Sequence, residues 1–459
     1  MRRLLAAVLG AALTLLPAGV AGGQVSDPTD LLKSDNVAVL GTLPNPGVIG
    51  ARFRGDVMFV TSVGGLTTYD ISNPVSPTLL GALPLPHFEN EDVDLGGDIL
   101  LISNDAAEST GVLYVIDISD PAHPALLSAA QMGGNPLFGG PGHTASCVLD
   151  CRFAWVTDGG GIRVMDLRNP ADPVSRGTFA TPAGADVATH DVQVDGDGLV
   201  WVVGFGGTAA YELPAGYEGD GLGRLVAKTG PEGHSTYFDE LGLGSGDNPN
   251  DFIHHNSHRR AGDDVVFVTE EDYARPGCRG AGSFQSWSLP VDRDGKPSGA
   301  DLKPLDLWTT ELLADAAQPA ALCSAHYFDV RRNLVAQGWY EQGVRFLDVH
   351  DPSDIRQVGY FVPPTSATWA AYFAPTDLSG EIVYSLDASH GIDVLRFDRP
   401  DRGPLSSTGR SCDGGKSRKQ CAEEGSPTLI APIRQQWVLG TTAAGSPTET
   451  FGFACRIGV

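Results

Sequence analysis

A short strand followed by a chemical stop recurs along this chain and constrains its fold more than any other feature. In LYVIDISDP, residues 113–121, Tyr114 and Ile116 share one strand face, which is the period-two pattern of a packed strand. The side-chain oxygens that follow can bond their own backbone, and Pro121 has no N–H with which to extend a ladder. A second short strand begins directly afterwards, at Ala125.

The same unit occurs seven times, which marks the chain as a repeat protein. The copies are 66–74, 113–121, 162–170, 344–352 and 392–400, with degenerate copies at 208–214 and 284–290. Measured between the positions of the aspartate, the intervals are 47, 49, 46, 76, 60 and 48 residues. Two of the units are therefore lengthened by insertions.

Each repeat also has room for two strands upstream of the stop. Four short strands per period of about 40–50 residues are typical of a propeller blade. Residues 36–43, NVAVLGTL, resemble the last strand of the first unit but have no unit before them. The sequence therefore predicts an all-β fold, a single seven-bladed β-propeller whose seventh blade takes this segment as its outer strand. A solenoid would need capping repeats and leaves the orphan strand without a role.

Three pentads, each followed by a turn and a proline, resemble the LVIVD-repeat family of exported bacterial and archaeal proteins. They are LYVID at 113–117, IRVMD at 162–166 and VRFLD at 344–348. The resemblance spans about residues 36–400 and implies the β-propeller fold. The family has no general activity that can be carried over to particular residues.

The two ends of the chain differ from the repeats. Residues 1–21 have two arginines, an apolar run and small residues at the end, which predicts a secretory signal peptide. The apolar run is too short to span a membrane. Residues 22–35 are expected to be a linker, 36–400 the propeller, and 401–459 a polar tail. The protein is expected to be extracytoplasmic, secreted or at the cell surface, and monomeric.

Charge and cysteine content fit an exported protein. Without the two arginines of the signal peptide the chain has 29 basic and 56 acidic residues, a net charge of −27, which disfavours nucleic acid and anionic membranes as partners. Seven cysteines in such a chain indicate disulfides. The expected pairs are Cys147–Cys151, Cys412–Cys421 and Cys278–Cys323, which leaves Cys455 over.

Histidines recur at the start of four successive inner strands. Three of them lie 23, 22 and 22 residues upstream of the stop position of their own blade, so they should lie at one height in the ring. Neutral histidine is a common transition-metal ligand. The candidate ligands for a copper, iron or zinc ion at the channel mouth are His143, His190, His255 or His258, and His326, with Glu91, beside Glu89 and Asp92, to balance the charge. The alternative to a metal site is that these histidines line a water-filled channel, as polar residues do, without contacting one another.

The geometry of a strand rules out two local motifs as metal sites. Along a strand, the steps from His143 to Cys147 to Cys151 are each about 13 Å, too long for one ion. A disulfide across the turn fits these two cysteines better. His254 and His258 would share a face only on a helix.

Both long insertions fall on the face that bears the histidines. They are residues 230–251, between two blades, and residues 270–282, inside one blade; Trp339, Tyr340, Glu341 and His390 lie in other loops of this face. Gly-x-Ser-x-Gly, His-Glu-x-x-His and Walker-type loops do not occur in the sequence. The leading hypothesis is an exported binding or scaffold propeller that engages a protein or small-molecule ligand through this face. The alternative is a metalloprotein, an oxidase or a hydrolase. Whether the protein is an enzyme stays open.

Overall fold

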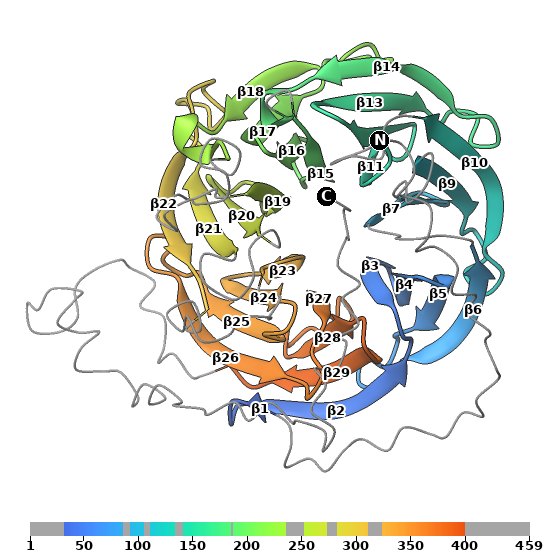
Figure 1. Ribbon diagram of the computed structural model, residues 1–459, viewed down its shortest axis with the longest axis vertical. Coiled ribbons are helices and arrows are strands. Elements are labelled where there is room, and N and C mark those ends of the chain that lie inside the picture. Colours follow the sequence, from blue (N-terminus) through green and yellow to red (C-terminus); the bar gives the residue numbers. More distant parts are fainter. Residues whose placement is uncertain are drawn as a thin grey trace, which may run out of the picture.

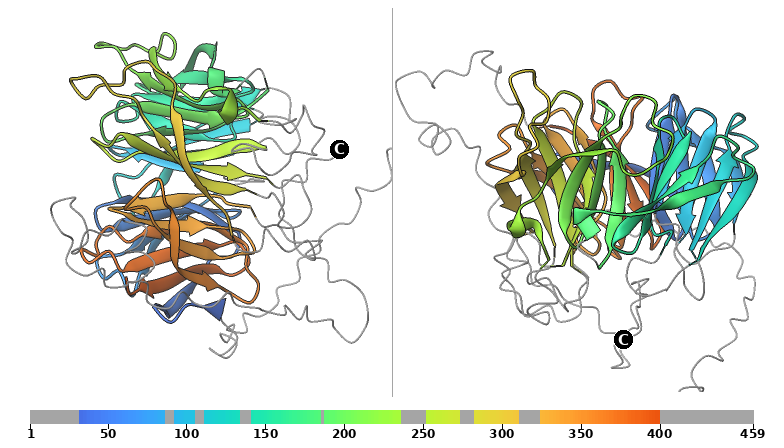
Figure 2. Two further views of the ribbon diagram at one scale, coloured as in Figure 1. Left: turned by 90° about the vertical axis from the view of Figure 1, so that its left-hand side faces the viewer. Right: turned by 90° about the horizontal axis from the view of Figure 1, so that it is seen from above.

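The computed structural model describes residues 32–85, 92–104, 111–133, 141–184, 187–235, 252–272, 282–310 and 324–399. Seven antiparallel sheets stand around a central channel, as Figure 1 shows. From the side the sheets fan out in a single layer around that channel (Figure 2). The prediction of a seven-bladed β-propeller is confirmed.

Six blades are built from consecutive strands, with the first strand of each innermost and the last at the rim. The first three blades are β3 (Val48–Arg54), β4 (Val57–Ser62), β5 (Gly65–Asp70) and β6 (Thr78–Pro84); β7 (Asp92–Gly96), β8 (Ile99–Asn104), β9 (Gly111–Asp117) and β10 (Ala125–Gly133); and β11 (Ala145–Val148), β12 (Phe153–Asp158), β13 (Gly161–Asp166) and β14 (Val174–Ala180). The next three are β15 (Thr189–Val194), β16 (Val200–Gly204), β17 (Gly207–Glu212) and β18 (Arg224–Lys228); β19 (Ile253–His258), β20 (Val265–Glu271), β21 (Ser283–Ser288) and β22 (Lys303–Trp308); and β23 (Phe328–Arg331), β24 (Leu334–Gly338), β25 (Val344–Asp348) and β26 (Arg356–Val362).

The seventh blade joins the two ends of the ring. It consists of β27 (Thr368–Phe373), β28 (Ile382–Asp387), β29 (Gly391–Phe397) and the N-terminal β2 (Val37–Pro44), which pairs with β29 from Val37↔Phe397 to Pro44↔Gly391. The predicted closure is confirmed. In the segment expected to be a linker, β1 (Leu32–Lys33) pairs with β26 and adds a fifth strand to the sixth blade.

The repeated stop is built by the chemistry that the sequence predicts. A carboxylate oxygen of Asp117 accepts the backbone N–H of Ser119 at 2.8 Å. The turn also docks on the preceding blade, because the Thr68 hydroxyl donates to the carbonyl oxygen of Pro121 at 2.6 Å. Equivalent bonds reach the prolines of other blades, from Ser128 to Pro170 and from Tyr384 to Pro74. The Asp–Pro turn therefore ends a strand and also fastens one blade to the next.

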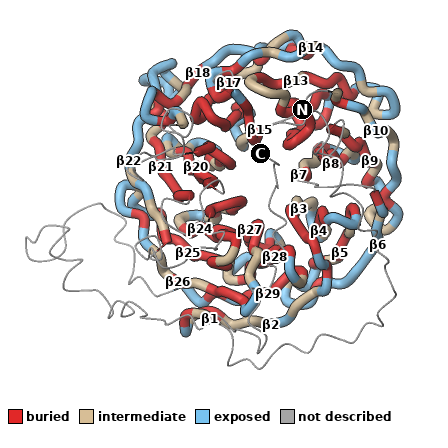
Figure 3. The backbone as a smooth tube through the Cα atoms, in the orientation of Figure 1, coloured by how far each residue is buried: buried red, intermediate tan, exposed pale blue. Residues whose placement is uncertain are grey.

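The apolar core lies between neighbouring blades, where the sheet faces meet. Figure 3 shows buried residues along the inner and middle strands and exposed residues along the outer ones. The largest buried side chains include Trp155, Trp201 and Trp287. A helix that is long and apolar enough to cross a membrane is absent from the described residues.

The predicted disulfide in the third blade is present. Cys147 and Cys151 are bonded, with their Cα atoms 4.3 Å apart, across the turn between β11 and β12. The other predicted pairs, Cys278–Cys323 and Cys412–Cys421, lie outside the described residues, as do Cys455, the predicted signal peptide and the tail at 401–459.

Candidate metal centre

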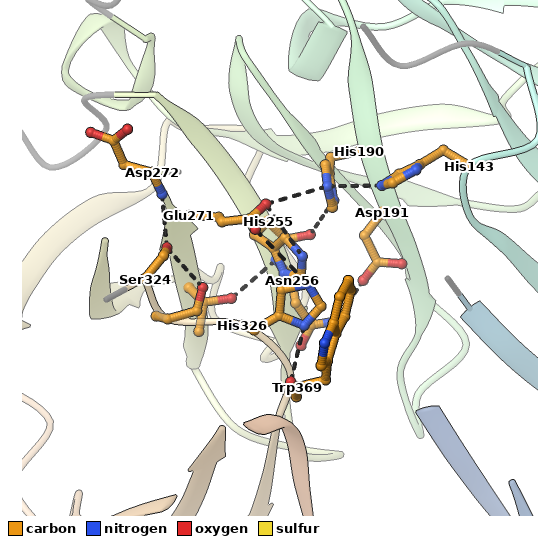
Figure 4. Close-up of polar contacts among 12 residues, drawn as sticks. His143, His190, Asp191, His255, Asn256, Glu271, Asp272, Ser324, His326 and Trp369 are labelled. Atoms are coloured by element: carbon orange, nitrogen blue, oxygen red, sulfur yellow. Dashed lines mark hydrogen bonds and ion pairs between the residues drawn. The ribbon is translucent and has the colours of Figure 1, made fainter. Parts of the chain in front are cut away.

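Four of the predicted histidines come together at the mouth of the channel. His143 and His326 lie just before β11 and β23, and His190 and His255 lie in β15 and β19. The centroids of successive rings are 4.4 Å apart for His143 and His190, 4.2 Å for His190 and His255, and 4.0 Å for His255 and His326. All four side chains are buried. Figure 4 shows them converging from four blades.

A β-bulge directs two of these side chains toward the channel. The pairing of β15 with β16 skips His190, and that of β19 with β20 skips His255. A bulge leaves the extra residue outside the ladder and changes the direction of its side chain. The pairing of β27 with β28 skips Trp369 in the same way, so an aromatic ring holds the corresponding place in the seventh blade.

His258 does not join the cluster, although it shares β19 with His255. Its ring packs against Phe328, with 6.2 Å between centroids, and burial lowers its pKa despite the opposing effect of Asp329. The sequence left His255 and His258 as alternatives, and the structure assigns the position in the cluster to His255. The neighbouring His254 bonds instead to the Thr208 hydroxyl through Nδ1, at 2.9 Å.

The carboxylate in the cluster belongs to Glu271, which the sequence analysis did not name as a ligand. Its Oε2 atom lies 3.8 Å from Nε2 of both His190 and His255, and its Oε1 atom lies 4.0 Å from Nε2 of His326. The residue was expected in a loop, but β20 extends through it because it pairs with Ile253 of β19. Glu91, the carboxylate named from the sequence, and Glu89 lie outside the described residues, and Asp92 begins β7.

Backbone carbonyls fix the tautomers of two imidazoles. Nδ1 of His190 lies 3.1 Å from the carbonyl oxygen of His255, and Nδ1 of His326 lies 3.0 Å from that of Trp369. A carbonyl can only accept, so in both rings Nδ1 carries the hydrogen and Nε2 presents its lone pair to the cluster. Nε2 of His143 lies 3.0 Å from that of His190 and therefore donates to it. Backbone bonds of this kind are typical of metal-ligating histidines.

Burial also keeps the imidazoles in the form that binds metals. It lowers the pKa of His190 well below the ordinary value, and the positive charge that His143 and His326 could carry lowers it further. Burial likewise lowers the pKa of His255, with the neighbouring histidines adding to the effect. Both rings are therefore neutral at physiological pH, and metal binding does not have to displace a proton from them.

The distances suit a single ion. His190, His255 and Glu271 each offer one donor atom, and these atoms all lie within 4.8 Å of one another. Metal–ligand bonds of about 2.1 Å place two ligands of one ion roughly 3–4 Å apart. This group can therefore hold a metal ion after small side-chain shifts, with His143 and His326 adjacent.

The comparisons with known proteins agree with this architecture. The fold defines the chain as a β-propeller, and the LVIVD repeat family matches residues 53–83 and 106–130. The chain therefore contains LVIVD repeats in its first two blades, and the pentad at 113–117 lies in the second of them. A search of the curated proteins finds no match.

Solved structures similar to this chain are also propellers. The Cps50 (Swd1) β-propeller domain of Myceliophteria thermophila is 11% identical, with a TM-score of 0.53, and the match covers 78% of this chain and 99% of that domain. The RRP9 WD40 repeats are 10% identical, with a TM-score of 0.50, and the match covers 80% of this chain and 99% of that one. At these identities the likeness shows the fold alone.

Proposed function

We propose that this propeller is a metalloprotein that binds one divalent transition metal ion at the channel mouth. The observation that carries the proposal is the orientation of the ligands around one point. Backbone carbonyls turn the Nε2 lone pairs of His190 and His326 inward, where they face the carboxylate of Glu271. Without an ion, the His190 lone pair accepts the Nε2–H of His143. A cation at this point would attract the imidazole lone pairs and the Glu271 carboxylate together.

The donor set favours copper, iron or zinc. Imidazole and carboxylate ligands suit these ions, and the group found among the described residues consists of imidazoles and a carboxylate. Two histidines and one carboxylate form the donor set of non-haem iron(II) centres and of some catalytic zinc centres. Such a set leaves coordination positions for water or substrate. We therefore place the protein among metal-dependent oxidases or hydrolases that act on a small molecule.

The binding or scaffold hypothesis concerns the same face of the ring. It depends on the insertions at 230–251 and 270–282, most of which lie outside the described residues. It stays a prediction, as does export of the protein. An ion at the channel mouth and a partner on the surrounding loops are compatible.

The test is elemental analysis of the full chain isolated from its native compartment. We expect close to one copper, iron or zinc ion per chain, lost in a His190→Ala, His255→Ala double variant. The matched control is His258→Ala, which removes a half-buried histidine of β19 outside the cluster and should retain the metal. A wild-type protein that is isolated without metal and takes up none of the three ions would overturn the proposal.

A further inference from the structure

Tyr340 lies in the loop between β24 and β25, and its backbone is held in an unusual conformation. Its φ angle is +23°, in the left-handed region that bulky residues rarely adopt. Its carbonyl oxygen accepts the backbone N–H groups of Gly343 and Thr368, at 3.2 and 3.0 Å, and the Ser366 hydroxyl at 2.6 Å. Strain of this kind persists where the surroundings over-determine the conformation and is often found at functional sites.

This conformation places the phenol of Tyr340 on the candidate metal centre. The hydroxyl group donates a hydrogen bond to Oε1 of Glu271, and the side chain is buried. The ring packs against His326 and Trp369, with centroid distances of 4.9 and 5.5 Å. Tyr340 belongs to the sixth blade and Glu271 to the fifth, so the bond joins two blades.

Because of this bond, the two carboxylate oxygens of Glu271 have different partners. Oε1 of Glu271 accepts the phenol hydrogen, whereas Oε2 lies 3.8 Å from Nε2 of both His190 and His255. A carboxylate can bind a metal through one oxygen or through both, and a hydrogen bond to one oxygen favours binding through the other.

We propose that Tyr340 is a positioning residue of the metal centre. It holds Glu271 as a ligand through Oε2 alone and thereby keeps one coordination position open for an exogenous ligand. This inference rests on the proposed function. It adds a residue outside the ligand set and specifies how the carboxylate binds.

The experiment titrates Co²⁺ into the metal-free full chain and compares wild type with Tyr340→Phe. Loss of a hydrogen bond to a metal ligand typically weakens metal binding by about 10–100-fold, and we expect a rise of this size in the cobalt Kd. The visible spectrum of bound Co²⁺ should also change, because Oε1 becomes available and the coordination number rises. A purely structural role for the phenol would leave that spectrum unchanged.

Tyr384→Phe is the matched control, because it removes another phenol that bonds across blades, to the carbonyl oxygen of Pro74. It should bind Co²⁺ with the wild-type Kd and spectrum. If Tyr340→Phe does not fold, Ser366→Ala provides the test, since it removes one donor from the Tyr340 carbonyl and should shift the Kd in the same direction by less.

The outcomes separate the two proposals. A wild-type chain that binds neither Co²⁺ nor copper, iron or zinc overturns the metal site itself. A wild-type chain that binds Co²⁺ together with a Tyr340→Phe variant of equal Kd and spectrum overturns the role of Tyr340 alone. Weaker binding and an altered spectrum in Tyr340→Phe, with Tyr384→Phe unchanged, support it.

Discussion

Arg52 of the first blade reaches across the central channel to Gln193 of the fourth, with Nη2 3.4 Å from Oε1. Gln193 in turn donates to Asp191, as does Asn256 of the fifth blade, and Nε of Arg52 lies 3.7 Å from Asp94 of the second. Along the inner strands, these residues come after the position that the histidines hold. The bonds between them therefore cross the channel at a different level from the candidate metal centre. We infer that a ligand reaches that centre from the other end of the channel.

Arg52→Ala should destabilise the protein in a pH-dependent way. Burial raises the pKa of Asp191 to about 6, and the positive charge of Arg52 opposes that rise. Burial also raises the pKa of Asp94, again against Arg52. Without the guanidinium group, ionising these carboxyls costs the folded state more. We expect a loss of about 2 kcal/mol in the free energy of unfolding at pH 8 and a smaller loss at pH 5, where Asp191 is protonated.

Urea unfolding of wild type and variant at the two pH values measures this difference. Arg52→Lys keeps a cation at the position and is the control, with a smaller loss at pH 8. An equal loss for Arg52→Ala at both pH values would show that the side chain contributes packing rather than charge.

His390 should stabilise the seventh blade as a cation. Nδ1 of His390 lies 3.3 Å from a carboxylate oxygen of Asp387, and Nε2 lies 2.8 Å from one of Asp393. Burial lowers the pKa of His390, but the hydrogen bonds to these two carboxylates outweigh burial and raise the pKa to about 10. A raised pKa means that the folded state binds the proton more tightly. The contribution is therefore complete below about pH 6.5, the ordinary pKa of histidine, and is lost as the pH rises through about 10.

A His390→Gln variant isolates this effect from other titrating groups. At pH 6 the wild type should exceed the variant by about 2 kcal/mol in free energy of unfolding, the usual size for hydrogen bonds to charged groups. The difference should shrink steadily up to pH 10 in denaturant titrations. A difference that stayed constant over this range would mean that His390 is neutral in the folded protein.

The features that could be predicted from the sequence depend on local chemistry or on equal spacing. The turn after Asp117 contains its own hydrogen-bond acceptors and its own Pro121, so counting such turns gives the seven blades. His143, His190 and His326 are almost equally spaced from the stop of their blades, so a ring of equivalent strands brings them to one height.

The features that were missed depend on contacts between distant segments. Glu271 was expected in the loop at 270–282, and it lies in a strand because Ile253 pairs with it. The bond from Tyr340 to Glu271 crosses from one blade to the next. β1 is two residues long, and it is a strand because ring closure brings it beside β26. These pairings come from tertiary structure, which a pattern along one segment does not contain.

Deleting residues 25–44 should open the ring. Without β2, the strand β29 loses its partner and exposes a row of backbone donors and acceptors, and the apolar residues that pack with Val37, such as Leu395 and Phe397, lose part of their cover. We expect lower solubility and a free energy of unfolding reduced by more than about 4 kcal/mol, in the range of severe lesions. Thr42→Ala is the control, since it removes the 2.6 Å bond to Asp393 and should cost about 1 kcal/mol. A deletion with wild-type solubility and stability would contradict the closure.

Glu271→Gln should abolish the stabilisation of the folded protein by a bound metal ion. An ion that binds the folded chain and not the unfolded chain raises the free energy of unfolding by about 2.7 kcal/mol at a hundredfold excess over its Kd. Glutamine preserves the size of the side chain and an oxygen for the Tyr340 hydroxyl but removes the charge that faces His190 and His255. We therefore expect added zinc to raise the melting temperature of the wild type and to leave that of Glu271→Gln nearly unchanged.

The matched control is Glu270→Gln, one residue earlier in β20 and on the opposite face of the strand, which should respond to zinc as the wild type does. If zinc stabilised Glu271→Gln as much as the wild type, the carboxylate would not be a ligand, and the histidines would have to hold the ion without it.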